Sequence, residues 1–264
     1  MTAIDTAFRR LRASGEKGLV VYLTAGDPTP AASLRYLRAA ADAGADILEV
    51  GVPFSDPTAD GPTIEAASRR ALSSGMNVRG ALELVRKFRE THATPVVLFG
   101  YCNPFHRYGW PALCEDGRQA GVDGFLVVDL PFEERGEALP SIRKEGLDWI
   151  PLAAPTSGMA RIRGIDRAGS GFLYLISVTG VTGVRQTLPP EVAAWTRKVA
   201  ASTRLPVAVG FGISTPAMAA AATRHADAAV VGSACVKIVE RNGRGTRGPA
   251  QLCRFVRSLK KALR

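Results

Sequence analysis

One pattern recurs along the chain: a helix end, a turn, an Asp or Ala, and then a continuous run of apolar residues. Three of these turns carry a glycine, which suits the C-terminal cap of a helix. A continuous apolar run is typical of a parallel strand that is covered on both faces. The four occurrences are AGADILEVG (43–51), AGVDGFLVVD (120–129), EGLDWIPLAA (145–154) and HADAAVVGSA (225–234).

Four more apolar runs bring the number of predicted strands to eight. They are GLVVYLTAG (18–26), TPVVLFGY (94–101), GFLYLIS (171–177) and LPVAVGFG (205–212). Helical segments separate the strands, and most strands begin roughly 20 to 35 residues after the previous one, the length of one βα unit. Eight such units with right-handed crossovers predict an α/β fold, a (β/α)8 TIM barrel, formed as a single domain over residues 1–264.

The predicted helices between the strands include two that lie outside the repeat. A helix over 2–13 precedes the first strand and is expected to cover the bottom of the barrel. An extra helix over 62–74, opened by Pro62, follows the second strand. An open doubly wound sheet is the alternative fold, but no G-x-G-x-x-G follows the first strand. The remaining predicted helices span 30–43, 78–91, 109–120, 133–145, 157–168, 189–203, 215–223 and 249–263.

Composition argues against several classes of protein. No apolar run reaches the ~18 residues of a membrane span, and the N-terminus lacks the apolar core of a secretory signal. We therefore expect a cytoplasmic protein with no membrane association. The four cysteines form no C-x-x-C pair and the three histidines form no H-E-x-x-H motif. We expect no metal site, and cysteines that act as small apolar packing residues.

The net charge of +10 is concentrated near the C-terminus. Residues 237–264 contain nine Lys or Arg and one acid, Glu240, whereas the rest of the chain carries only about +2. Nucleic acid is one possible partner for such a segment, but no nucleic-acid motif accompanies the charge. We favour a solvated helix face and expect no nucleic-acid partner. The opposite face carries an apolar stripe that would dock on the core: Leu252, Phe255, Val256, Leu259 and Leu263.

Glycine-rich turns follow the last three predicted strands. They are TGVTG (179–183), GFGIS (210–214) and GSA (232–234). Glycines allow backbone N–H groups to approach an anion, and Ser233 begins a helix whose N-terminus is partly positive. In such barrels a phosphate often lies between the loops after strands 7 and 8. These turns could be plain connections, but three in succession indicate a phosphate site.

Glu49 is the main candidate for catalysis. It interrupts the apolar run ILEVGVPF at the C-terminal end of the second strand, where active sites of these barrels lie. Burial there would raise the pKa of its carboxyl group toward neutrality, which suits a general acid and base. An ion pair with a cation inside the barrel is the structural alternative, but the strand runs carry no suitable Lys or Arg apart from Lys237, next to the tail.

Two further candidates are less clear from the pattern. Asp60 lies with Asp56 in the loop PFSDPTADGPT (53–63), and it could serve in the site or merely cap the following helix. Tyr174 lies in the middle of the sixth strand, where a core tyrosine is the usual interpretation. Both alternatives stay open on the residues alone.

At these residues the chain resembles the tryptophan synthase alpha chain family. The resemblance runs from Phe8 to the last helix. It rests on the motifs LEVGVPFSDPTADGPTI (48–64), YLISVTGVTG (174–183), GFGIS (210–214) and VGSACVK (231–237). It implies a lyase that cleaves indole-3-glycerol phosphate to indole and glyceraldehyde 3-phosphate without a cofactor of its own. The implied partner is a beta chain that carries pyridoxal phosphate, in an alpha2beta2 complex.

The resemblance also implies a role for individual residues. Glu49 and Asp60 match the family's two catalytic acids, and Tyr174 matches its supporting tyrosine. Residues 177–188 match its flexible lid. Matched substrate contacts are Tyr22, Thr182, Gly183, Gly212, Gly232 and Ser233. Matched contacts to the beta chain are Pro53, Asp56, Asn103 and Pro131. Tyr22 departs from the family pattern, because phenylalanine often stands there beside the indole.

Two other functions compete with this one. The chain could be a stand-alone lyase or another phosphate-binding barrel enzyme, which activation by an added beta chain would distinguish. A non-enzymatic role in nucleic-acid binding through the basic tail would appear as salt-sensitive binding that is lost on deletion of 244–264.

Overall fold

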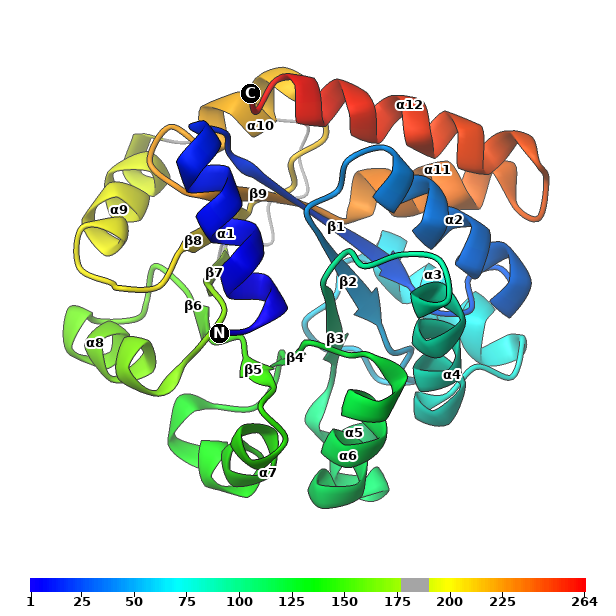
Figure 1. Ribbon diagram of the computed structural model, residues 1–264, viewed down its shortest axis with the longest axis horizontal. Coiled ribbons are helices and arrows are strands. Elements are labelled where there is room, and N and C mark those ends of the chain that lie inside the picture. The colour runs from blue at the N-terminus through cyan, green and yellow to red at the C-terminus, as the bar shows by residue number, and fades with distance from the viewer. Residues whose placement is uncertain (177–189) are drawn as a thin grey trace.

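The computed structural model describes residues 1–176 and 190–264. In these residues one parallel sheet runs in the order β5-β4-β3-β2-β1-β9-β8-β7-β6, with helices around its outside (Figure 1). Its strands are β1 (Gly18–Thr24), β2 (Ile47–Gly51), β3 (Val96–Gly100), β4 (Gly124–Val127), β5 (Asp148–Trp149), β6 (Leu152–Ala153), β7 (Leu173–Ile176), β8 (Val207–Gly210) and β9 (Ala228–Val231).

The predicted fifth strand, 145–154, is divided at Pro151, which has no N–H to donate to a ladder. Its first piece, β5, pairs with β4, and its second piece, β6, pairs with β7. The chain between them continues the ladder on both sides: Ile150 N–H donates to Phe125 O at 2.8 Å, and Tyr174 N–H donates to Pro151 O at 2.9 Å. The sheet therefore closes into the predicted (β/α)8 barrel, and the open doubly wound alternative is wrong.

The helices follow the predicted repeat with two differences. Residues 133–145 were expected to form one helix but form the 3-10 segment η1 (Phe132–Glu137) and a short α7 (Leu139–Lys144). A short helix after β3, α5 (Cys102–Tyr108), was not predicted, and Gly109 separates it from α6. The others are α1 (Ala3–Ser14), α2 (Pro30–Asp42), α3 (Pro62–Ser73), α4 (Val78–Arg89), α6 (Trp110–Ala120), α8 (Met159–Ala168), α9 (Pro190–Ala200), α10 (Pro216–Ala222), α11 (Ser233–Asn242) and α12 (Arg247–Lys261).

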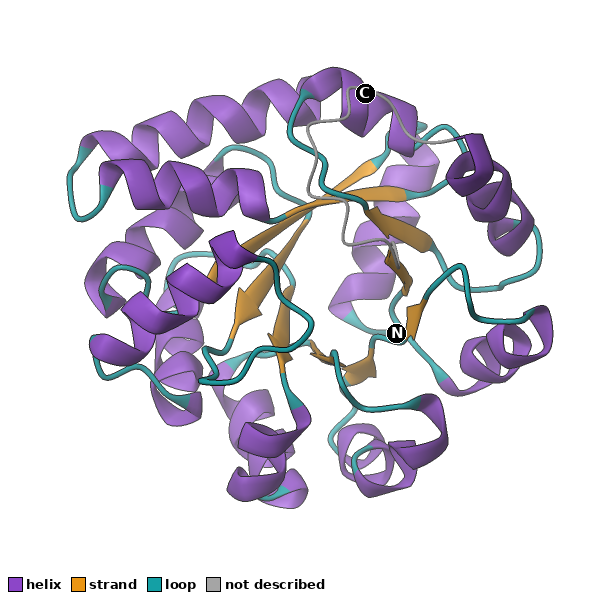
Figure 2. Cartoon of the chain, turned by 180° about the vertical axis from the view of Figure 1, so that it is seen from behind, coloured by secondary structure: helices purple, strands orange, loops and turns teal. Residues whose placement is uncertain are grey.

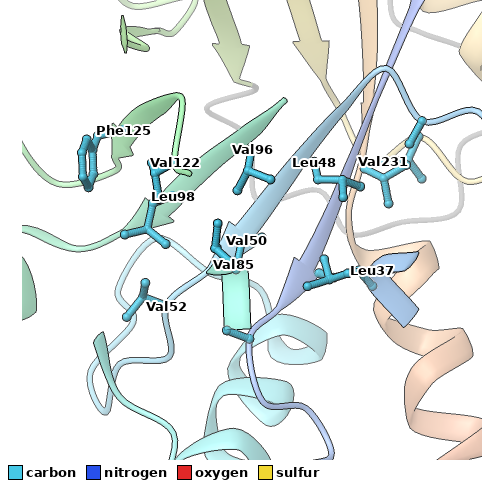
Figure 3. Close-up of a cluster of buried hydrophobic side chains, with 14 of the residues drawn as sticks. Leu37, Leu48, Val50, Val52, Val85, Val96, Leu98, Val122, Phe125 and Val231 are labelled. Atoms are coloured by element: carbon cyan, nitrogen blue, oxygen red, sulfur yellow. The ribbon is translucent and has the colours of Figure 1, made fainter. Parts of the chain in front are cut away.

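Two apolar layers form the core. The larger lies between the strands and the outer helices, where Val50, Leu98 and Val85 gather between β2, β3 and α4 (Figure 3). The smaller fills the barrel interior and is sealed at the bottom by Ile4, Phe8 and Leu11 of α1. Figure 1 shows α1 across one end of the ring of strands, and Figure 2 shows the ring from the other end. The expected bottom helix is thus confirmed.

The Asp that precedes several strands in the repeat has a common structural role. The carboxylates of Asp46, Asp123 and Asp227 accept the backbone N–H of the first residues of a neighbouring strand: Leu19 at 2.9 Å, Val96 at 2.7 Å and Val207 at 2.8 Å. Each side chain extends the ladder by one bond at the bottom of the barrel, where a backbone N–H would otherwise be buried without a partner.

The C-terminal helix α12 joins this bottom layer. Its stripe packs on the core as predicted, with Leu252, Val256 and Leu259 fully buried. Lys260 departs from the expected solvated face, because its side chain is 8% exposed and its Nζ lies 2.8 Å from Asp46 Oδ2. Glu16, at 3.2 Å, is its second acidic partner. Part of the basic charge of the tail is therefore neutralised inside the fold.

We predict that Asp46→Ala lowers the free energy of unfolding by about 3 kcal/mol or more, because it leaves Lys260 buried without its closest partner. Urea denaturation measures this loss. Glu83→Ala is the matched control: Glu83 pairs with Arg86 and Lys87 on an exposed helix face, so its loss should cost at most about 0.5 kcal/mol. Equal effects of the two substitutions would contradict the structural role of Asp46.

Candidate active site

A cavity of about 260 Å³ opens at the C-terminal ends of the strands, where active sites of this fold lie. Its lining combines two acids, two tyrosines, several glycines and a set of apolar side chains. The described residues around it are Tyr22, Glu49, Ala59, Asp60, Gly61, Ile64, Phe99, Val128, Leu152, Tyr174, Ile176, Gly210, Gly212, Ile213, Val230, Gly232 and Ser233.

Strand alternation explains why these side chains face the cavity. Val20, Ile47 and Phe172 belong to the barrel interior. Because side chains two residues apart in a strand share a face, Tyr22, Glu49 and Tyr174 point into the barrel one layer higher. The same rule places Phe99, Val128 and Leu152 in the cavity wall. These three residues were not among those predicted from the sequence, although counting two positions on from each inward residue would have found them.

Each of the two tyrosines has room because the neighbouring strand carries a glycine beside it. A Cβ atom at Gly51 would collide with the ring and hydroxyl of Tyr22, and one at Gly210 would collide with those of Tyr174. Tyr22 also packs edge-on against Phe99, with ring centroids 5.0 Å apart. Tyr174 therefore lines the cavity and is not solely a core residue.

Glu49 is fully buried, and neither of its carboxylate oxygens has a hydrogen-bond partner in the described part of the chain. The ion pair considered as an alternative is absent from the described residues. Burial raises the pKa of Glu49 to about 8, so the carboxyl group is largely protonated at neutral pH. The pKa values of Tyr22 and Tyr174 are also raised, chiefly by burial and in addition by a charge on Glu49.

Asp60 lies at the rim of the same cavity, in the loop between β2 and α3. The N-cap of α3 is Gly61, so Asp60 does not cap that helix. Burial raises the pKa of Asp60 to about 6, the Tyr101 hydroxyl opposes this rise, and Glu65 adds to it. At neutral pH the cavity therefore holds a mostly protonated Glu49 and a mostly ionised Asp60, which is the division expected of an acid–base pair.

The glycine-rich end of the cavity lies at β8 and β9. Gly212 has a φ of 68°, a conformation that favours glycine, and, its chain neighbours aside, no atom of the described residues lies within 4 Å of where its Cβ would be. Gly232 and Ser233 stand at the N-terminus of α11. Two of the three predicted glycine turns thus converge on one cavity. The predicted contacts Thr182 and Gly183, and the predicted lid over 177–188, fall outside the described residues.

The predicted partner contacts follow β2, β3 and β4, which are adjacent in the sheet: Pro53, Asp56 and Pro131 lie in loops, and Asn103 lies in α5. Asp56, Asn103 and Pro131 are exposed, whereas Pro53 is buried and offers little surface of its own. Asn103 and Phe54 line a separate open cleft of about 390 Å³ on this side of the barrel. The partner contacts at these residues stay predictions.

The described residues hold neither a metal-binding cluster nor a membrane-spanning helix. No group of three or more His, Cys, Asp or Glu in residues 1–176 and 190–264 is arranged to hold a metal ion. Within the same residues, no helix is both long enough and apolar enough to cross a membrane. The four cysteines are free, and Cys114 and Cys235 are buried as packing residues.

Comparisons with known proteins agree with this geometry. The family model for the tryptophan synthase alpha chain matches residues 8–264. A tryptophan synthase alpha chain of Citrifermentans bemidjiense is 48% identical, with 100% of this chain and 98% of the relative covered. The crystal structure of the alpha chain from Legionella pneumophila has a TM-score of 0.92 at 35% identity and covers 100% of this chain and 97% of its own.

A chain from the tryptophan synthase α2β2 complex of Pyrococcus furiosus is also similar, with a TM-score of 0.86 at 39% identity, covering 92% of this chain and 98% of its own. Sequence and structure thus give the same answer over the full length of the barrel. The chain belongs to the tryptophan synthase alpha chain family.

Proposed function

We propose that this chain cleaves indole-3-glycerol phosphate to indole and glyceraldehyde 3-phosphate, with Glu49 as the group that moves the protons. One observation carries the proposal: a fully buried carboxyl group without a partner among the described residues faces a cavity at the mouth of the barrel. Burial of such a group lowers the stability of the fold. The same burial brings its pKa near neutrality, which a catalytic acid and base requires.

The reaction is a retro-aldol cleavage, and Glu49 serves it twice. The protonated carboxyl group first gives its proton to C3 of the indole ring, which makes the ring a cationic indolenine. The resulting carboxylate then takes a proton from the substrate. This proton comes from the hydroxyl group on the glycerol phosphate side chain, next to the C–C bond that breaks. The O–H electrons form the aldehyde, and the C–C bond electrons return to the ring as neutral indole. Glu49 ends the cycle protonated again.

The other cavity residues have supporting roles in this proposal. Ionised Asp60, near the ring N–H, stabilises the positive charge of the indolenine, worth about 3 kcal/mol by analogy with other preorganised groups. Gly212, Gly232 and Ser233 bind the phosphate at the N-terminus of α11 and orient the substrate. Tyr22 and Phe99 supply an aromatic wall for the indole. Tyr174 is proposed as a second wall that holds Glu49 in place.

The proposed partner is a tryptophan synthase beta chain that consumes the indole. Structures similar to this chain include tryptophan synthase complexes from Pyrococcus furiosus and Mycobacterium tuberculosis, which supports the pairing. The pyridoxal phosphate would belong to that partner, and this chain would need no cofactor. The similarity to enzymes of amino-acid biosynthesis also favours a cytoplasmic location.

Glu49→Gln should fold normally but lose lyase turnover, because the amide cannot exchange a proton with the substrate. Indole release from indole-3-glycerol phosphate, measured with and without a beta chain, tests this. Glu83→Gln, on an exposed helix face, is the control and should keep full activity. A near-wild-type rate in Glu49→Gln would remove Glu49 from the mechanism.

Asp60→Asn should lower kcat by about 100-fold or more with a smaller change in KM, because the carboxylate acts on charge that develops in the transition state. Steady-state kinetics of indole release separate the two parameters. If only KM changed, Asp60 would be a binding group and not a catalytic one.

Glu49 should also make stability depend on pH. Its folded-state pKa of about 8 lies above the ordinary value of 4.5, so the folded protein holds the proton more tightly than the unfolded chain does. The wild type should therefore lose stability relative to Glu49→Gln as pH rises from about 4.5 to about 8, by about 3 kcal/mol or more. Urea denaturation of both proteins across this range measures the difference, and a constant difference would contradict the raised pKa.

A further inference from the structure

We propose that Tyr101 is the positioning residue of the second acid: its hydroxyl group and its ring fix the loop that carries Asp60 over the cavity. This inference rests on the role proposed above for Asp60. Residues 52–61, which join β2 to α3, are called the acid loop below. Tyr101 directly follows β3 and is 2% exposed.

Tyr101 touches the acid loop at both of its ends. Its hydroxyl oxygen accepts the backbone N–H of Ala59 at 3.1 Å. Its ring packs against Phe54, with centroids 5.3 Å apart and planes at 36°. One aromatic side chain directly after β3 therefore contacts both the start of the loop and the residue immediately before Asp60.

The other hydrogen bonds that the loop tip makes with described residues are internal. Thr58 N–H donates to Asp56 O at 2.9 Å, and Asp60 N–H donates to Pro57 O at 3.1 Å. These bonds shape the turn but do not attach it to the barrel. Among the hydrogen bonds of the described residues, the one from Ala59 to Tyr101 joins the tip, 55–60, to the C-terminal end of β3. The position of Asp60 over the cavity thus depends on Tyr101.

The hydroxyl group of Tyr101 can make a second hydrogen bond, as a donor. A tyrosine hydroxyl can accept one hydrogen bond while it donates its own proton in another. The oxygen accepts from Ala59, and the proton is available to Asp60, whose pKa Tyr101 lowers against the effect of burial. The pKa of Tyr101 is itself raised, mainly by burial, so the donor stays protonated. Donation to a carboxylate favours its charged form.

The remaining titratable groups around the pair act in the opposite direction or are neutral. Glu65 of α3 raises the pKa of Asp60, and Asp129, after β4, faces Tyr101. The charge of Asp60 raises the pKa values of Tyr22 and Tyr174 further, so both hydroxyl groups stay protonated. Among the described groups that act on the pKa of Asp60, Tyr101 is the one that lowers it. The hydroxyl group therefore favours the ionised form of the second acid.

Tyr101→Phe tests the proposal, because it keeps the ring against Phe54 and removes the hydroxyl group alone. We expect kcat for indole release to fall about tenfold at neutral pH, the size of one hydrogen bond to a charged group. Because the pKa of Asp60 rises without the donor, the acid limb of the kcat–pH profile should move to higher pH. KM should change much less than kcat.

Tyr36→Phe is the matched control. Tyr36 is also buried, and its hydroxyl group also bonds to the backbone, here as the donor to Gly243 O at 3.0 Å, but it lies on α2, away from the cavity lining. Its variant should lose a comparable amount of stability and keep the wild-type pH profile. A profile that moved equally in both variants would mean a general structural effect and would overturn the proposal.

The double variant Tyr101→Phe with Asp60→Asn separates this proposal from the one it rests on. If Tyr101 acts through Asp60, its loss should have little further effect once Asp60 is Asn. A full tenfold loss in that background, or an unmoved acid limb in Tyr101→Phe alone, would overturn the role of Tyr101. Wild-type kcat in Asp60→Asn alone would instead overturn the role of Asp60, and the role of Tyr101 with it.

Discussion

The site depends on one unfavourable arrangement, the burial of a carboxyl group without a partner in the described structure. Glu49 lies in the upper layer of the barrel interior, where every neighbour from the strands is aromatic, aliphatic or glycine. Such a position favours the neutral acid and brings its pKa to the range where it can both give and take a proton. The rest of the barrel must offset this cost.

The two ends of the barrel have different roles. At the bottom, α1 seals the interior, and Asp46 joins β1, Arg10 and the buried Lys260 in one hydrogen-bonded group. At the top, Gly51, Gly210 and Gly212 remove side chains where the tyrosines and a ligand need room. Stability is thus concentrated at one end and the functional groups at the other, as is usual for this fold.

Much of this arrangement follows from the sequence. Continuous apolar runs after helix caps predicted the strands. The position of Glu49 at the end of one such run predicted that its side chain is buried at the mouth of the barrel. Other features depend on contacts that local patterns do not contain. The break at Pro151, the short helix α5 and the buried Lys260 are set by tertiary packing. Tyr101 ended a predicted strand, but its bond to Ala59 joins residues 42 positions apart, and only the fold brings them together.

The protonation state of Glu49 is the claim on which the account depends most, and it can be measured directly. Carbon-13 NMR of protein labelled at the glutamate side-chain carboxyl carbons, compared with the spectrum of Glu49→Gln, would identify the Glu49 signal. The account predicts that this signal titrates with a midpoint near pH 8. A midpoint near the ordinary value of 4.5 would show a solvated or paired carboxylate and would contradict it.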